Sequence, residues 1–270
     1  MDRGSAGWWG PLFGARARDW ADTWEGPAGW GTAVYEHVLN HAGIGPGTRV
    51  LDCGCGAGRF AGLAAGRGAT VAGIDAAGAL VEIARERAPA GDFRVGDLED
   101  LPWPDAAFDV VTGLSSFQFA QDPVRALGEA RRTARRWVVV VVPTRVPESG
   151  IPQVVGAVVP LLSPTGLQAL QASTTSPLSG PAGLETTVAV TGLRAVEDHE
   201  VASPTQFDSV ADAVRAFLAV GPVSLAIEDA GEGPVADVIR RGLRPFVDRN
   251  GRVLLPGWYR VVVAEAAGAG

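Results

Sequence analysis

Lysine is missing from this sequence, because all 23 basic residues are arginine. A Walker-type phosphate loop requires a lysine after its glycines, so that class of nucleotide site is excluded. Cysteine is scarce as well: the two residues stand in a Cys-x-Cys arrangement, which is too few for a disulfide framework. We therefore expect a cytoplasmic protein in a reducing environment.

Long apolar runs and a dominant positive charge are also lacking. No stretch of about 18 consecutive apolar residues occurs, so no membrane span is expected. The N-terminal segment lacks the apolar core of a secretory signal. The net charge is −7 and no basic stripe follows a predicted helix, which argues against a nucleic-acid partner. A hydrophobic share of 47% suffices for one α/β domain with additions or for two small domains.

Strand-like and helix-like segments alternate over residues 48–142. The last strand-like segment, WVVVVV, is apolar on both faces, which suits a parallel sheet covered by helices on both sides. The alternation predicts a doubly wound, Rossmann-like α/β sheet. The expected strands cover 48–53, 69–75, 92–95, 108–112 and 137–142, and the expected helices cover 58–66, 78–88 and 123–135.

Two regions lie outside this alternation and resemble covers over a site. Residues 1–42 hold five of the eight tryptophans and end in a predicted helix over 32–41. Residues 145–190 are rich in Pro, Gly, Ser and Thr around an apolar segment at 154–162. Farther on, we expect a strand over 193–201, helices over 209–220 and 234–243, and a last strand over 258–264.

The stretch VLDCGCGAGRF joins the first predicted strand to the first predicted helix. Two thiols in this spacing point apart and have no histidine nearby, so we predict no metal site here or elsewhere. A dinucleotide fingerprint would need a third glycine where this chain has Arg59. The spacing is instead that of Asp52, Gly54, Gly56 and Gly58. Glycines let a ligand lie against the backbone, and the helix N-terminus attracts an anionic group.

An acid follows each of three successive predicted strands. Asp52 can face an ammonium group, Asp75 can accept hydrogen bonds from ribose hydroxyls, and Asp97 can accept from an exocyclic adenine amine. One such acid alone is commonly a turn or a helix cap. Because the carboxyl ends of parallel strands form one ligand-binding edge, three together indicate an extended ligand with methionine-like, ribose and adenine portions.

The motifs VLDCGCGAG, GIDAAGALVEIAR and VGDLEDLPWPDAAFDVV together resemble class I S-adenosyl-L-methionine-dependent methyltransferases, most of all the small-molecule branch with a type 11 methyltransferase domain. The resemblance is strong over about residues 46–142 and implies a seven-stranded sheet with an antiparallel last strand. We expect a single domain over residues 1–270. It would comprise an N-terminal lid (1–42), a cofactor-binding core (46–142), a substrate-side insertion after the fifth strand (145–190) and a C-terminal part (191–270).

The resemblance also implies which residues bind S-adenosyl-L-methionine, with S-adenosyl-L-homocysteine as the product. The glycine loop would follow the methionine portion, the second acid the ribose, the third-strand motif the adenine, and the segment GLSSFQFAQDP the methyl-bearing sulfur. Two tryptophans before the 32–41 helix are expected to form an aromatic wall for the cationic sulfur. The expected cofactor-binding residues are Asp52, Gly54, Cys55, Gly56, Asp75, Ala76, Asp97, Leu98, Leu114, Ser115, Trp20 and Trp24.

No catalytic residue is named from the sequence. The family often carries paired histidines where this chain has Gln118 and Phe119. His37 and His41 share one face of the predicted 32–41 helix, and for them a base role stays open beside a packing or surface role. His199 is expected to face solvent. Methyl transfer is an in-line displacement that positioning can largely accelerate, so a base is optional.

The predicted function is therefore S-adenosylmethionine-dependent methyl transfer to a small-molecule acceptor, including secondary metabolites, by a monomer or homodimer. The alternative is a methyltransferase-like protein that binds the cofactor and catalyses a non-methylating reaction such as cyclisation. An NAD-dependent oxidoreductase is disfavoured by Arg59 in the loop and by Asp97 with its flanking motif.

Overall fold

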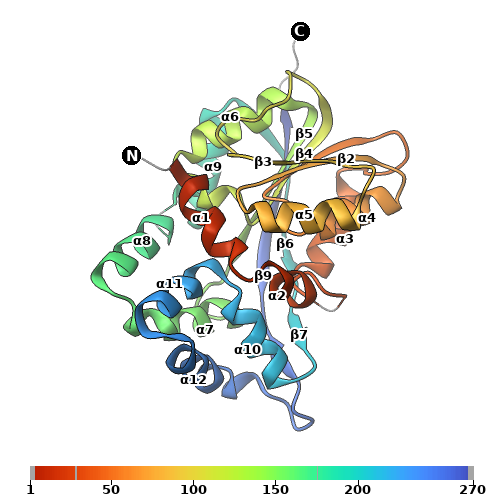
Figure 1. Ribbon diagram of the computed structural model, residues 1–270. Coiled ribbons are helices and arrows are strands. Elements are labelled where there is room, and N and C mark those ends of the chain that lie inside the picture. The colour runs from red at the N-terminus through yellow and green to blue at the C-terminus, as the bar shows by residue number, and fades with distance from the viewer. Residues whose placement is uncertain (1–3, 28, 175, 267–270) are drawn as a thin grey trace.

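A seven-stranded sheet forms the centre of the computed structural model, which describes residues 4–27, 29–174 and 176–266 (Figure 1). Its strands are β1 (Arg49–Cys53), β2 (Thr70–Asp75), β3 (Asp92–Val95), β4 (Phe108–Leu114), β5 (Ala134–Thr144), β6 (Leu193–Ala202) and β9 (Trp258–Ala266). Their order is β3-β2-β1-β4-β5-β9-β6. The first five strands pair in parallel, whereas β9 lies antiparallel between β5 and β6. The doubly wound sheet with an antiparallel last strand is thus confirmed.

The helices of the described residues are α1 (Gly4–Gly14), α2 (Ala17–Thr23), α3 (Thr32–His41), α4 (Arg59–Gly66), α5 (Gly78–Arg87), α6 (Pro123–Thr133), α7 (Gly150–Val158), α8 (Pro164–Thr174), α9 (Pro181–Val190), α10 (Val210–Leu218), α11 (Gly221–Ala230) and α12 (Glu232–Gly242). Capping residues in the local sequence determine where several of these helices begin. Asp122 caps α6 by accepting from the Arg125 amide, with Pro123 in the first turn. Ser209 caps α10 by accepting from the Asp212 amide.

Both faces of the sheet are buried under helices. The valines of β5 show this directly, since Val139 and Val141 belong to one apolar core while Val138, Val140 and Val142 belong to the other. Helices α3, α4 and α5 supply the first core, and α6 and α9 supply the second. The alternation follows from the two-residue period of a strand, and it confirms the prediction made from WVVVVV.

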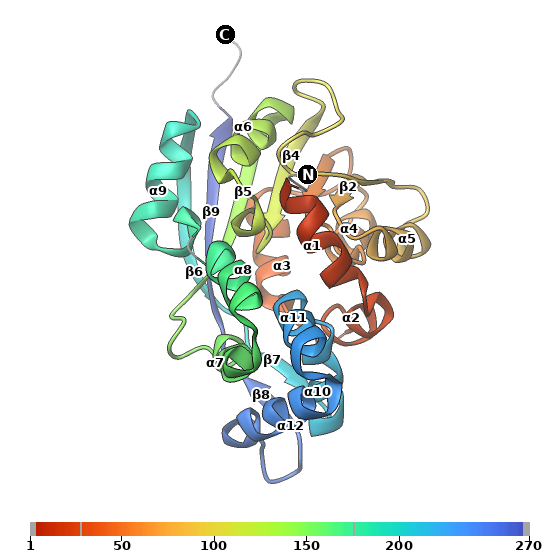
Figure 2. The same ribbon diagram turned by 60° about the vertical axis from the view of Figure 1, so that its left-hand side comes forward.

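A further layer of helices lies beyond the carboxyl ends of the parallel strands. Helices α7, α10, α11 and α12 pack together there, with Val154, Phe217 and Ile239 buried between them (Figures 1 and 2). Two short strands, β7 (Thr205–Phe207) and β8 (Val253–Leu255), pair beside this layer. Helix α1 contacts both α5 and α11, and α2 contacts both α5 and α10. The N-terminal segment therefore bridges the sheet and the helical layer.

The structure also differs from the sequence expectations outside the core. Helices α1, α2 and α11 were not predicted, because Gly and Pro lie within α1, α2 is short, and α11 begins with Gly and Pro. The described residues of 145–190 include the helices α7, α8 and α9; α7 lies against the cavity described below, whereas α9 packs on α6 and β6. Within the described residues no single helix has the length and apolarity that crossing a membrane requires; α10 and α11 reach them only together, across an 87° bend.

Candidate active site

A cavity of about 320 Å³ lies at the carboxyl ends of the parallel strands, under α1, α2, α7 and α11. It is lined by the loops that follow β1, β2, β3 and β4 and by residues of the N-terminal segment. All twelve residues expected from the sequence to hold the cofactor line this one cavity. The fold therefore brings together residues that the sequence places far apart, and their binding role remains a prediction.

The loop after β1 needs glycine for two separate reasons. Gly54, Gly56 and Gly58 have φ angles of 73°, 54° and 81°, in the left-handed region that disfavours side chains. A Cβ atom at Gly56 would also lie 2.2 Å from the Glu25 Oε1 atom, and one at Gly54 would lie 2.3 Å from the Ser116 Cβ. The backbone of the loop can thus approach a ligand only because these positions lack side chains.

Glu25 is the main site residue that the sequence analysis missed. Its carboxylate is buried at the N-terminus of α4, where it accepts from the Ala57 amide at 2.7 Å and the Arg59 amide at 3.0 Å. It also accepts from Trp20 Nε1 at 2.7 Å and pairs with Arg87 at 3.0 Å. Burial raises the pKa of Glu25, and these donors oppose the rise.

The expectation that this helix N-terminus would attract an anionic group of the ligand is therefore corrected. A carboxylate of the chain itself lies there, since Glu25 accepts from the Ala57 and Arg59 amides. The residue comes from the segment between α2 and α3, 32 positions before Ala57, and no local motif marks it.

Asp52 is buried at the end of β1, beside the glycine loop. Its Oδ1 accepts from the Thr112 hydroxyl at 2.9 Å. Burial raises the pKa of Asp52 to about 8, and the nearby Glu25 and Asp75 carboxylates add to the rise while the Thr112 bond opposes it. The side chain is consequently protonated at neutral pH until a cation comes next to it.

The other two predicted acids are held by backbone amides. Asp75 accepts from the Gly56 amide at 2.9 Å and from the Ala77 amide at 2.8 Å, so it ties the loop after β1 to the end of β2. Burial raises the pKa of Asp75, and these amide bonds oppose the rise. Asp97 accepts from the Glu99 amide at 3.0 Å. Each acid thus also shapes its own turn, and a carboxylate has acceptor capacity beyond these bonds.

The electrostatics of the cavity are one-sided. Four acids line it, Glu25, Asp52, Asp75 and Asp97, whereas no Arg or His side chain of the described residues does. An environment of this kind favours a cationic ligand and disfavours an anionic one, because the acids are close together and shielded from water.

Two polar atoms at the end of β4 have no hydrogen-bond partner within the described residues. They are the buried Ser115 Oγ and Gln118 Oε1, and both residues line the cavity. Ser115 itself has a φ of 57°, which is unusual for a residue with a side chain. Unsatisfied buried groups and backbone strain gather at ligand sites, so this loop has the character of one.

Aromatic and aliphatic side chains form the rest of the wall. Trp9, Phe13 and Phe119 contact one another with ring centroids 5.2–6.0 Å apart. The α7 side of the cavity adds Ile151, Pro152 and Val155. Trp20 and Trp24 line the cavity as expected, with Trp20 also donating to Glu25 and Trp24 donating to the Ala216 carbonyl at 2.6 Å.

The three histidines lie elsewhere. His37 and His41 face the edge strand β6 and do not line the cavity. His199, expected to face solvent, is half-buried against them. Tyr35 does line the cavity, and burial raises the pKa of its phenol well above the usual value, which opposes a role as a base at neutral pH.

Comparison with known proteins agrees with this geometry. Residues 51–142 match the family model described as a methyltransferase domain. A malonyl-[acyl-carrier protein] O-methyltransferase of Serratia marcescens is 36% identical over 102 residues, which are 38% of this chain and 40% of that protein. The matched segments span about two fifths of the length of the curated relatives.

Solved structures resemble nearly the whole fold. The YcgJ protein of Bacillus subtilis has a TM-score of 0.56 at 18% identity, covering 86% of this chain and 97% of that one. The [4+2]-cyclase SpnF has a TM-score of 0.52 at 19% identity, covering 86% and 79%. Residues 51–142 are therefore similar to the methyltransferase domain family, and the chain as a whole has a doubly wound fold like that of these solved structures.

Proposed function

We propose that this protein transfers a methyl group from S-adenosylmethionine to an apolar small-molecule acceptor. The observation that carries the proposal is the acid-lined cavity at the carboxyl ends of β1 to β4, in which no basic side chain of the described residues participates. S-adenosylmethionine carries both an ammonium and a sulfonium, so its charges complement such a site. A dinucleotide, with its anionic pyrophosphate, does not.

Each portion of the cofactor has residues that would hold it. Asp52 would face the ammonium beside the backbone of Gly54 and Gly56, and Asp75 would accept from the ribose hydroxyls. Asp97 and the Leu98 amide would hold the adenine, and Leu114 and Ser115 would flank the sulfur. When bound, the sulfonium would supply an electrophilic methyl group that the acceptor attacks in line. The S–CH₃ bond breaks as the acceptor–CH₃ bond forms, S-adenosylhomocysteine leaves as the neutral thioether, and the acceptor's proton is lost to solvent.

The acceptor side of the cavity suits an apolar molecule with one or two polar groups. The walls around Trp9, Phe13 and Phe119 remove water from the acceptor, and Gln118 Oε1 and Ser115 Oγ offer hydrogen bonds that fix its orientation. Because these two polar groups do not titrate near neutral pH, acceleration would come mainly from holding acceptor and methyl group aligned.

The named reaction of the Serratia relative is an O-methylation, but that similarity extends over 38% of this chain. The parts of the acceptor wall that come from α1, α7 and α11 lie outside the family match at residues 51–142. We propose a secondary-metabolite acceptor, a cytoplasmic location and a monomeric or homodimeric state. The net charge of −7 supports a small-molecule acceptor over a nucleic acid.

The test has two stages. Calorimetric titration with S-adenosylhomocysteine and with NADH should show binding of the first and none of the second; the reverse result would remove the proposal. Incubation with S-adenosylmethionine carrying a radiolabelled methyl group and a panel of apolar phenols and enols should then yield a labelled product one methylene unit heavier. A product of unchanged mass that still requires the cofactor would instead support the cyclisation alternative, which the SpnF-like fold accommodates.

A further inference from the structure

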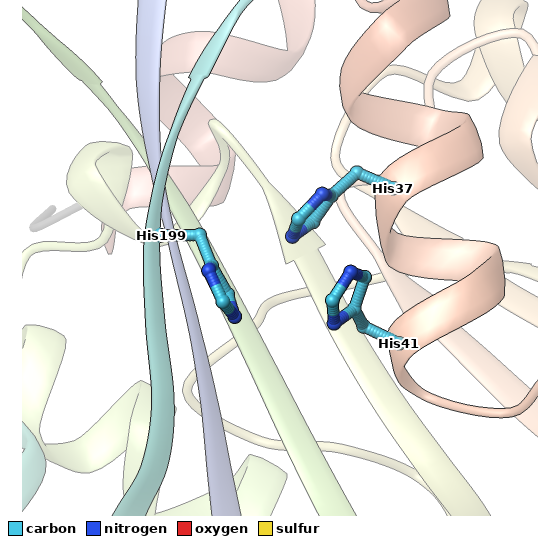
Figure 3. A group of neighbouring side chains, drawn as sticks. All are labelled: His37, His41 and His199. Atoms are coloured by element: carbon cyan, nitrogen blue, oxygen red, sulfur yellow. The ribbon is translucent and has the colours of Figure 1, made fainter.

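All three histidines of the chain meet at one place on the surface, away from the cavity. His37 and His41 project from α3, and His199 projects from the edge strand β6 toward them (Figure 3). The rings of His37 and His41 stack with centroids 3.9 Å apart, and the His199 ring lies 5.0 Å from the first and 4.9 Å from the second. The sequence contains three histidines, and all three belong to this cluster.

The nitrogen atoms of this cluster are close enough to share one ion. One ring nitrogen of each histidine can be chosen so that all three lie within 4.8 Å of one another. A tetrahedral ion with metal–nitrogen bonds of about 2.1 Å requires roughly 3.4 Å between ligands, so a modest rotation of the rings suffices. Histidines four residues apart on a helix present their rings to one metal, as in the helical zinc motifs.

A carboxylate completes the donor set. Glu197 lies two residues before His199 on the same face of β6, and its Oε2 is 2.7 Å from His41 Nδ1 and 3.2 Å from His199 Nε2. It can serve as a fourth ligand or orient the imidazoles from behind, as carboxylates beside metal-bound histidines do.

The cluster also has a free donor atom and the access that a metal needs. The buried Nε2 of His37 has no hydrogen-bond partner among the described residues. The side chains of His41 and His199 are 37% and 40% exposed, so an ion can enter from solvent. Neutral imidazole is the form that binds metal.

We propose that His37, His41, His199 and Glu197 form a binding site for one divalent transition metal of the zinc class. Three imidazoles with one carboxylate suit Zn²⁺ and related ions, whereas Mg²⁺ and Ca²⁺ prefer oxygen ligands. The two cysteines are no competitors, because both are buried at the glycine loop and burial raises the pKa of both thiols well above the usual value.

A bound ion would clamp α3 to the edge of the sheet. Helix α3 carries Tyr35 in the wall of the cavity, and β6 has a paired neighbour on one side only, namely β9. Joining the two by coordination would stabilise the folded chain, since an ion that binds only the folded state shifts unfolding by mass action. The proposal does not depend on methyl transfer.

The experiment titrates metal-free full-length protein with ZnCl₂ by calorimetry and records the absorption spectrum of the Co²⁺-substituted protein. Wild type should bind one Zn²⁺, show the intense visible bands of tetrahedral Co²⁺, and unfold at a higher temperature with Zn²⁺ than without. Both His199→Ala and His41→Gln should weaken Zn²⁺ binding at least about tenfold and abolish the thermal shift. Lowering the pH below about 6 should weaken binding in the wild type, because protons compete for the imidazoles.

Glu36→Gln is the matched control. Glu36 lies on the same helix as His37 and His41, but its carboxylate pairs with Arg67 and not with the histidines. It should bind Zn²⁺ like wild type. Circular dichroism establishes that each variant is folded. Three results would each overturn the proposal. They are a wild type that does not bind Zn²⁺ stoichiometrically, His199→Ala and His41→Gln variants that bind Zn²⁺ as tightly as wild type, and a Cys55→Ala variant that loses Zn²⁺ binding.

Discussion

Replacing Asp52 by asparagine tests the electrostatics of the cavity without adding or removing volume. The asparagine Oδ1 can still accept from the Thr112 hydroxyl, so the main loss is the ionisable group. Burial raises the pKa of Asp52 in the folded chain to about 8, against an unfolded value of about 3.9. Between these two values the folded chain holds one proton more than the unfolded chain.

The sign and size of the effect follow from that proton. A raised carboxyl pKa contributes stability that is fully present below about pH 3.9 and is lost as the pH rises toward about 8. Inside this window the wild-type free energy of unfolding falls by about 1.4 kcal/mol per pH unit through Asp52. Since the variant lacks this contribution, its stability relative to wild type should grow by about 2 kcal/mol between about pH 6 and about pH 7.5.

Urea unfolding of both proteins at several pH values measures the difference directly. Asp92→Asn is a suitable control, because the Arg94 guanidinium beside Asp92 lowers the pKa of that carboxyl and leaves it charged in both states over this range. A difference between wild type and Asp52→Asn that stays constant with pH would refute the reasoning. The variant should also bind S-adenosylhomocysteine more weakly, because it cannot become an anion beside the ammonium.

Three further predictions concern the loop and the acceptor wall. Glu25→Gln should lower the free energy of unfolding by about 1–2 kcal/mol in urea titrations, because a neutral amide caps the Ala57 and Arg59 amides less well and no longer pairs with Arg87; unchanged stability would contradict the capping role. Gly56→Ala should abolish calorimetric binding of S-adenosylhomocysteine, because the added Cβ atom would collide with the Glu25 carboxylate. Gly62→Ala is the control: its Cβ atom would have no other atom within 4 Å, so the variant should bind normally and gain up to about 1 kcal/mol of stability. Gln118→Ala should lower kcat/KM for the acceptor about tenfold with little change in cofactor affinity, and a selective loss of cofactor affinity in titrations would argue against its place in the acceptor wall.

The core of the fold could be predicted because its signals are local. The first three predicted strands agree with β1, β2 and β3 to within one residue at each end. Strand β4 ends two residues later than predicted, and β5 begins three residues earlier and ends two residues later. The glycines of the loop after β1 could also be interpreted from the sequence, because a backbone in the left-handed region strongly favours glycine. Even the gathering of the twelve expected cofactor residues follows, because parallel strands bring their carboxyl ends to one edge.

The remainder depends on contacts between distant segments. Glu25 reaches the α4 N-terminus from another part of the chain, and nothing in its own neighbourhood distinguishes it from a surface acid. The spacing of His37 and His41 suggests a shared face, but their meeting with His199 depends on how α3 packs against β6. The acceptor wall likewise combines side chains of α1, α7 and α11, which come from three distant parts of the chain.

A crystal structure of the protein with S-adenosylhomocysteine would test the central claim most directly, namely that the acid-lined cavity holds an adenosyl cofactor. The account predicts the amino group beside Asp52, the ribose hydroxyls on Asp75, and the adenine between Asp97 and Leu98, with the sulfur facing Ser115 and the aromatic wall. A nucleoside bound elsewhere, or a cavity that stays closed to it at saturating concentration, would contradict the account.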